Sequence, residues 1–171
     1  MTSGCLFSVL AKDRNAMDLD YGPEYDIFRQ EVRAFIKEHR HLAPPPGDRA
    51  ARPSAEAIEW QKLLIAHGYT ARTIPCEYGG YGAEPDFLKS RIVAEEFSRA
   101  RMPGGLANQG ISMLVPTLLE LGSEEQKRRW IEPTLKGDVV WCQGYSEPGA
   151  GSDLANLKTS ARVENGEFVI N

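Results

Sequence analysis

The residues best suited to chemistry lie in one short segment, which runs from Trp141 to Asp153 and reads WCQGYSEPGAGSD. Its glycines allow the backbone to approach a ligand closely, and neighbouring N–H groups can form an anion-binding nest. The hydroxyl of Ser152 adds a neutral donor for a phosphate oxygen. The segment therefore predicts a ligand-binding loop. A tight turn with a capping serine is the structural alternative that these residues alone leave open.

Several known catalytic motifs are absent from this segment. Gly149-Ala150-Gly151 lacks the third glycine of a dinucleotide-binding fingerprint, and the sequence has no G-K-[ST] of a phosphate-binding P-loop. Ser146 is not part of a G-x-S-x-G motif, because Pro148 stands where the last glycine would be. None of the three histidines lies near it in the sequence. These absences argue against a serine hydrolase.

Other polar residues favour structural roles. Glu95 and Glu96 are adjacent carboxylates on a predicted helix, and such charges are usually solvated or ion-paired rather than catalytic. His39 and His41 near a helix end suit the negative end of the helix dipole better than a metal site. Asp153 is expected to cap the loop. We predict no metal site and no disulfide framework, since the three cysteines are far apart: Cys5, Cys76 and Cys142.

The elements before residue 138 are predicted to be helices. Apolar residues at three- and four-residue steps indicate a helix over 23–41 and a second over 54–67, with Ser54 as N-cap and Gly68 at the C-terminal end. A third is expected after Pro85. Its inward residues are expected to be Phe87, Leu88, Ile92 and Phe97.

Two further helices precede residue 138. An apolar stretch over 111–121 contains Pro116, where the helix should bend or begin. Ser123-Glu124-Glu125-Gln126 is a capping box that predicts another helix, ending between Pro133 and Gly137. Trp60 and Trp130 are expected in the core.

From residue 138 the pattern changes to β-structure. Strands are predicted over 139–145, 159–163 and 168–170, and Asn165-Gly166 is a strong hairpin signal. The order indicates two structural units that join near Gly137. Two or three strands make a poor sheet with open edges, so we expect the chain to be the N-terminal piece of something larger.

Composition limits the functional classes. Of 171 residues 42% are hydrophobic, too many for a disordered chain, and a net charge of −4 argues against a dedicated nucleic-acid binder. No apolar run approaches the roughly 20 residues of a membrane span. Residues 1–17 are expected to be a disordered leader without a targeting signal, and Met17 is a candidate natural start. Unpaired cysteines then favour a reducing cytoplasm.

Four stretches, taken in order, resemble the acyl-CoA dehydrogenase family, and its bacterial members most. The central one is the signature QGYSEPGAGSD over 143–153. The others lie before it, at 74–80, 95–99 and 122–127. The resemblance covers most of residues 18–171.

The resemblance implies a mostly α fold. Residues 18–137 would form the family's N-terminal helical domain, and 138–171 would form the first strands of a truncated, β-barrel-like middle domain. The family's third part, a C-terminal helical bundle, would be absent.

The family's chemistry is likewise implied. Its members bind FAD and an acyl-CoA, a glutamate takes the α-proton, and flavin N5 takes the β-hydride to give a trans-2-enoyl-CoA. An electron-transfer flavoprotein or a similar acceptor then takes the electrons, and members are homotetramers or heteromers. The glutamate of most members lies in the C-terminal bundle or on a helix equally absent from this chain, so no catalytic residue is assigned.

Residue by residue, the resemblance assigns the flavin contacts to positions in the signature. Ser152 would touch both FAD and the CoA thioester, and Asn108 would help to line the acyl pocket. The positions assigned to the cofactor are Gln143, Gly144, Tyr145, Ser146, Gly151 and Ser152.

Two other functions stay open on the sequence alone. One is an acyl-CoA oxidase-like flavoenzyme, which passes electrons to oxygen. The other is a catalytically inactive truncated product or a non-catalytic partner domain.

Overall fold

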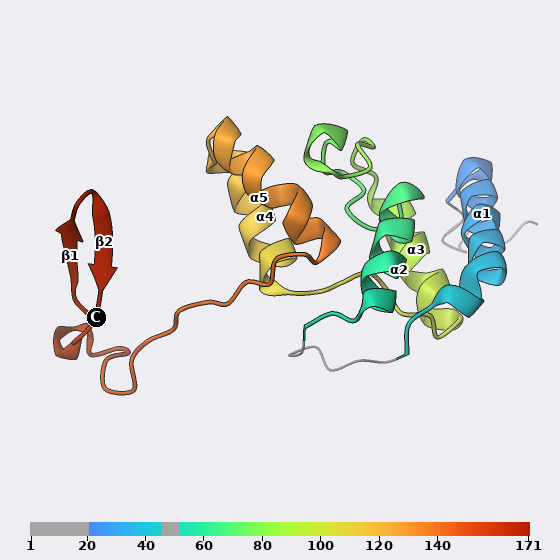
Figure 1. The fold of residues 1–171 in the computed structure, drawn as a ribbon. Coiled ribbons are helices and arrows are strands. Elements are labelled where there is room, and N and C mark those ends of the chain that lie inside the picture. Colours follow the sequence, from blue (N-terminus) through green and yellow to red (C-terminus); the bar gives the residue numbers. More distant parts are fainter. Residues whose placement is uncertain (1–20, 46–51) are drawn as a thin grey trace, which may run out of the picture. The chain divides into compact units, whose positions relative to one another are not determined.

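Pro23 begins the first helix at a position where a missing backbone N–H has no intrahelical partner to lose. Figure 1 shows the computed structural model, which describes residues 21–45 and 52–171. The described residues fall into two compact units, one with 21–43 and 85–104 and the other with 44–45, 52–84 and 105–171. The predicted leader over 1–17 lies outside the described residues.

The first unit is a pair of packed helices, α1 (Pro23–His39) and α3 (Phe87–Arg99), with a 3-10 turn, η1 (Arg40–Leu42), after α1. Asp86 caps α3, since its Oδ1 accepts the Lys89 N–H at 2.9 Å. The apolar residues between the helices are buried. They are Val32, Phe35 and Ile36 of α1 with Ile92 and Phe97 of α3.

The prediction that Phe87 points inward is wrong, because its residue is 76% exposed. Phe87 is the first residue of α3. Helical side chains tilt toward the N-terminus, so this one projects past the start of the helix and away from its packed face. The periodicity of apolar residues places Phe87 on the apolar face of the helix. Because the helix begins directly after its N-cap, Asp86, Phe87 lies at the helix end and is exposed.

In the second unit, α2 (Ala55–Ala66) is capped as predicted. The Ser54 hydroxyl accepts the Ala57 N–H, and Gly68 follows the helix with a φ of 70°. Gln61 of this helix is buried and joins two other segments. Its Nε2 donates to the Leu135 carbonyl at 2.7 Å, and its Oε1 accepts the Leu106 N–H at 2.8 Å.

The predicted capping box is also confirmed at the start of α5 (Glu124–Lys136). The Ser123 hydroxyl accepts the Gln126 N–H, and the Gln126 side chain accepts the Ser123 N–H. Gly137 ends the helix in the left-handed region, with a φ of 81°. The core against α5 consists of Tyr78, Val115, Ile131 and Leu135; Tyr78 comes from a 3-10 turn, η2 (Cys76–Tyr78).

The stretch predicted as one bent helix over 111–121 is a π-helix, η3 (Gly110–Leu114), that continues into α4 (Val115–Leu121). The Val115 N–H donates to the Gly110 carbonyl, five residues back. Pro116 supplies no N–H, so the hydrogen-bond register changes just before it. The expectation that a helix begins near this proline is confirmed, since α4 begins at Val115, whereas the sequence does not predict the π-helix before it.

After α5 the structure forms one hairpin and no strand over 139–145. Strands β1 (Ala161–Glu164) and β2 (Glu167–Ile170) pair antiparallel, with Ala161 opposite Ile170, and Asn165-Gly166 forms the predicted two-residue turn. The predicted strand over 139–145 is wrong, because no strand among the described residues pairs with its backbone. A 3-10 turn, η4 (Leu154–Asn156), precedes the hairpin.

The expectation for the tryptophans is confirmed for Trp60, which is buried, whereas Trp130 is half-buried. Helices long and apolar enough to cross a membrane do not occur in the described part of the chain.

Candidate functional site

The segment Gln143–Ser146 is an exposed, irregular stretch of the second unit. In the described chain, no backbone group of residues 140–146 bonds to another backbone group. A Cβ added at Gly144 would meet no atom within 4 Å. Because backbone polar groups form hydrogen bonds wherever they can, this row of N–H and C=O groups is available to a ligand.

Trp141 ties this segment to α5. Its Nε1 donates to the Thr134 hydroxyl at 2.8 Å, and the Thr134 hydroxyl donates to the Trp130 carbonyl at 2.6 Å. The indole also lies against η3, because a Cβ added at Gly110 would be 2.4 Å from Trp141 Cδ1. The absence of a side chain at Gly110 thus leaves the space that the indole fills.

The loop after the segment is organised by Glu147. Its carboxylate accepts the Thr159 N–H at 2.6 Å and the Lys158 N–H at 3.1 Å. These bonds, first those with Thr159, lower the pKa of Glu147, because they stabilise its ionised form. The Ala150 N–H donates to the Glu147 carbonyl, and Ala150 is buried. The loop over 147–159 is therefore closed by one side chain.

Gly151 and Ser152, which the resemblance assigns to the cofactor, are exposed on this loop. In the parts of the chain that are described, no hydrogen bond joins either residue to Gln143–Ser146. Asp153 accepts a bond from the Asn156 side chain at 3.2 Å, a contact within the loop. The two halves of the predicted cofactor site are thus linked through the chain, and Glu147 ties the loop of the second half to Lys158 and Thr159.

Asn108, the predicted acyl-pocket residue, is half-buried before η3. Its Oδ1 accepts the Ile111 N–H at 3.0 Å, so its side chain helps to start the π-helix. The next residue, Gln109, donates from Nε2 to the Tyr145 hydroxyl at 3.0 Å. The structure therefore brings the Asn108 turn to the flavin-assigned segment, 36 residues further along the chain.

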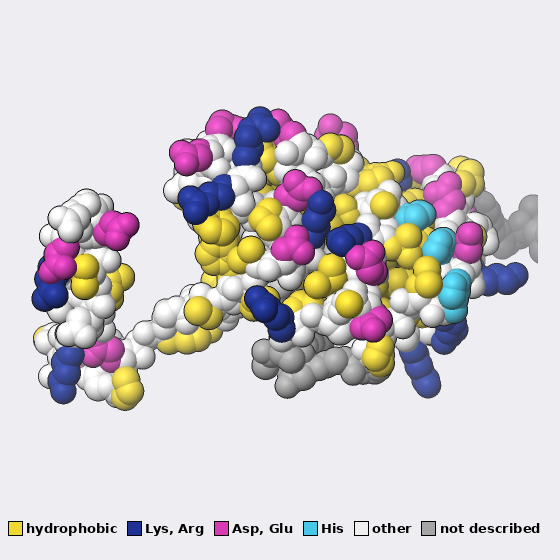
Figure 2. Space-filling model, viewed as in Figure 1, with side chains coloured by type: hydrophobic (Ala, Val, Ile, Leu, Met, Phe, Trp, Pro, Cys, Tyr) yellow, Lys and Arg dark blue, Asp and Glu magenta, His cyan; other side chains and the backbone are white. Residues whose placement is uncertain are grey.

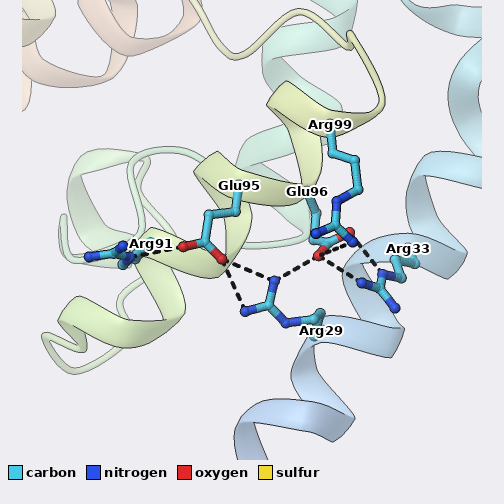
Figure 3. Close-up of polar contacts among 6 residues, drawn as sticks. All are labelled: Arg29, Arg33, Arg91, Glu95, Glu96 and Arg99. Carbon is cyan, nitrogen blue, oxygen red and sulfur yellow. Dashed lines mark hydrogen bonds and ion pairs between the residues drawn. The ribbon is translucent and has the colours of Figure 1, made fainter. Parts of the chain in front are cut away.

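The paired carboxylates belong to an ion-pair cluster in the first unit (Figure 3). Glu96 accepts bonds from Arg29 at 2.7 Å and from Arg33 at 2.8 Å, and Glu95 pairs with Arg91 at 2.9 Å. Arg33 first, then Arg29, lower the pKa of Glu96 to about 2, against the effect of its burial. Arg91 and then Arg29 lower the pKa of Glu95. Carboxylates held ionised in this way are poor proton acceptors, which agrees with the predicted structural role.

The remaining candidates are also structural. His39 Nδ1 lies 3.1 Å from the Phe35 carbonyl, at the end of its own helix. The described residues contain no group of three or more His, Cys, Asp or Glu side chains placed to hold a metal ion. Acidic and basic side chains alternate over the helices in Figure 2, as is usual for solvated helix faces.

Four residues shape this region that the sequence alone does not single out for it. The pattern of the sequence places Trp141 in a strand and gives no role to Thr134 or Gly110. Glu147 was only one of the carboxylates of the loop. Of these four residues, only Trp141 has a feature in the sequence that indicates its role. An aromatic side chain just before a glycine-rich stretch needs a packing partner.

Comparisons with known proteins show the family to which the chain belongs. The model of the acyl-CoA dehydrogenase N-terminal domain matches residues 22–138. Acyl-CoA dehydrogenase IpdE1 of Mycolicibacterium smegmatis is 36% identical over 149 residues, which are 82% of this chain and 37% of that protein.

Solved structures of acyl-CoA dehydrogenases also match this chain. The ChsE4–ChsE5 complex of Mycobacterium tuberculosis matches with a TM-score of 0.59 and 32% identity, over 91% of this chain and 38% of that chain. An acyl-CoA dehydrogenase of Bacillus anthracis complexed with FAD matches with a TM-score of 0.50 and 28% identity, over 89% and 26%. The chain spans less than two fifths of the length of these three relatives. From the matched helical domain and these relatives together, the chain belongs to the acyl-CoA dehydrogenase family.

Proposed function

We propose that this chain is part of an FAD-dependent acyl-CoA dehydrogenase, which oxidises an acyl-CoA to a trans-2-enoyl-CoA. The observation that supports the proposal most is the exposed segment 143–146, in a chain of this family. Among the described residues, its backbone groups form no hydrogen bond with another backbone group. When bound, FAD supplies the acceptor for the hydride that leaves the β-carbon of the acyl chain. The chain's own residues would bind FAD and the acyl-CoA and orient them relative to each other.

The donor set of the segment suits a flavin. A flavin ring carries several carbonyl oxygens and ring nitrogens along one edge, and these need hydrogen-bond partners in one row. Backbone N–H and C=O groups of Gly144 and Tyr145, the Gln143 amide and the Ser146 hydroxyl offer such partners. On the loop that Glu147 closes, the exposed backbone of Gly151 and the Ser152 hydroxyl would contact another part of the cofactor.

We assign contacts with the two parts of the substrate, the CoA thioester and the acyl chain, to different residues. Ser152 would lie toward the CoA thioester, and the turn that Asn108 organises would border the acyl chain. The Gln109–Tyr145 hydrogen bond supports this, since it joins that turn to the flavin-binding segment. The proton acceptor would come from residues other than Glu95 and Glu96, because both are ion-paired.

Domain organisation and assembly are part of the proposal. Residues 18–137 would form the N-terminal helical domain, and 138–171 would begin a β-domain. The ChsE4–ChsE5 relative is a complex of two named proteins. We therefore propose that this protein also works as a multimer, either of identical or of different chains, in the cytoplasm, and passes electrons to an electron-transfer flavoprotein or a similar acceptor.

The test is flavin binding and turnover by the protein in the full length in which it is expressed. Purified protein should retain FAD, with a flavin visible spectrum, and should form enoyl-CoA from acyl-CoA with an artificial electron acceptor. Ser146→Ala and Ser152→Ala should each weaken FAD or acyl-CoA binding by about tenfold, as expected for one lost hydrogen bond in a dry site.

The matched control is Ser98→Ala, an exposed serine of α3, which should change neither affinity. Absence of both flavin and enoyl-CoA formation would contradict the proposal and favour the non-catalytic alternative. Oxygen consumption with acyl-CoA, in place of turnover with the acceptor, would assign the oxidase-like activity.

A further inference from the structure

Trp141 occupies a slot between α5 and η3 in the second unit. Three contacts define the slot: the Thr134 hydroxyl accepts the indole N–H at 2.8 Å, the Trp130 ring lies edge-on with centroids 5.4 Å apart, and Gly110 leaves room for Cδ1. Thr134 is fully buried. Its hydroxyl is itself oriented by its bond to the Trp130 carbonyl. The hydroxyl that accepts the indole N–H is therefore already held in a fixed orientation.

The chain on either side of Trp141 is held much less firmly. Val140 and residues 142–146 are exposed, and in the described chain none of their backbone groups pairs with another backbone group. Gln143 follows Trp141 by two residues. The Gln109–Tyr145 hydrogen bond is a second tether, but both of its groups face solvent. The half-buried Trp141, bonded to the buried Thr134, is thus the last attachment to the core before the segment that is proposed to bind the flavin.

We propose that Trp141 is a positioning residue for cofactor binding, and this rests on the proposed function. Its indole, held by Thr134 and by the space at Gly110, places the start of Gln143–Ser146 before the cofactor arrives. A segment that is anchored in advance loses less conformational freedom on binding, so the ligand binds more tightly without any added contact. Trp141 itself need not touch the flavin.

The substitution pair Thr134→Val and Thr134→Ser separates the hydrogen bond from packing. Valine has nearly the same shape but no hydroxyl, whereas serine keeps the acceptor. FAD titration of the full-length protein should show a loss of affinity of about five- to tenfold for T134V, and a change below about twofold for T134S. Trp141→Phe, which keeps a ring and removes the N–H, should reproduce the T134V loss.

A second measurement follows the anchor without FAD. In NMR spectra of protein with ¹⁵N-labelled indoles, the Nε1–H signal of Trp141 is identified by its loss in W141F. Its exchange with solvent should be slow in the parent protein and in T134S, and at least severalfold faster in T134V. The midpoint of thermal unfolding is measured for each variant as well. Fast indole exchange with an unchanged midpoint indicates loss of the hydrogen bond alone, whereas a lowered midpoint indicates a destabilised fold.

The outcomes are distinct. Faster indole exchange in T134V with unchanged FAD affinity in both T134V and W141F would overturn the positioning role and leave the proposed function intact. Slow exchange in T134V would also overturn it, because the hydroxyl would not hold the indole. A parent protein that binds no FAD would refute the proposed function and the role built on it, while its indole exchange still reports whether the anchor exists. Loss of affinity in T134V and W141F, with rescue in T134S, supports the inference.

Discussion

Arg29 and Glu96 face each other across the first unit, with Nη1 of one 2.7 Å from Oε1 of the other. The first lies on α1 and the second on α3, 67 residues further along the chain. The Glu96 side chain is only 3% exposed, and it is also bound by Arg33. A buried carboxylate that is ionised and fully paired connects the two helices at a fixed register, because any shift would leave its charge without a partner.

Replacing Glu96 with Gln should therefore destabilise the first unit. The neutral amide keeps the shape but loses two charge-assisted bonds, and a cost of about 2 kcal/mol is expected. Amide hydrogen exchange in α1 and α3 should accelerate accordingly. The control is Glu95→Gln, whose side chain is 37% exposed and whose loss should cost less than about 1 kcal/mol. Equal effects of the two substitutions would contradict the special role of the buried carboxylate.

The same carboxylate makes stability depend on pH in a defined window. Its folded-state pKa of about 2 lies below the ordinary 4.5, so between these values the unfolded chain binds more protons than the folded one. The contribution is complete above about pH 4.5 and is lost as the pH falls through 2, on the order of 3 kcal/mol in all. Urea unfolding of wild type and E96Q from pH 2 to pH 6 should show their difference shrink on acidification. A gap that stays constant down to pH 2 would refute this assignment.

Local signals in the sequence predicted the helices well. The caps at Ser54 and Ser123 depend on a side chain and a backbone N–H three residues away, so a single sequence contains both partners. The hairpin at Asn165-Gly166 is local for the same reason. In contrast, the two arginines that donate hydrogen bonds to Glu96, Arg29 and Arg33, lie on a helix far away in the sequence, and nothing in the sequence pairs them.

The wrong predictions concern segments whose local structure depends on tertiary contacts. The stretch 139–145 has the composition of a strand, but the Trp141 indole packs beside Gly110. In the part of the chain that is described, no strand pairs with the backbone of this stretch. The π-helix at 110–114 likewise depends on the Asn108 side chain as well as on the proline that follows. For the site, the motif predicts a set of cofactor-binding residues, and this set stays a prediction. The residues that hold the motif in place were visible only in the structure.

Gln61 offers a test of buried polar bridging in the second unit. Gln61→Leu would keep the volume but leave the Leu135 carbonyl and the Leu106 N–H without their side-chain partner, in a position only 1% exposed. We expect a loss of about 2–3 kcal/mol in unfolding free energy, measured by urea denaturation. Lys62→Ala, at the next position, breaks only an exposed pair with Glu59 and should cost under about 0.5 kcal/mol. A stable Q61L protein would show that these backbone groups find other partners.

Glu147 should control the order of the signature loop. Its carboxylate is the acceptor for the N–H groups of Lys158 and Thr159, so Glu147→Ala should raise the hydrogen-exchange rates of these two amides severalfold. Glu147→Gln keeps one acceptor oxygen and should give an intermediate rate. Glu167→Ala, which removes another exposed carboxylate, serves as the control and should leave both rates unchanged.

Acidification should reproduce the effect of E147A in the unmodified protein. The bonds from Thr159 and Lys158 lower the pKa of Glu147, so the carboxylate stays ionised below its ordinary range and the loop stays closed there. As the pH falls through that lowered pKa, protonation weakens the two bonds, and the protection of both amides relative to E147A should disappear. Protection that persists in E147A at neutral pH would instead show that the backbone of the loop closes without this side chain.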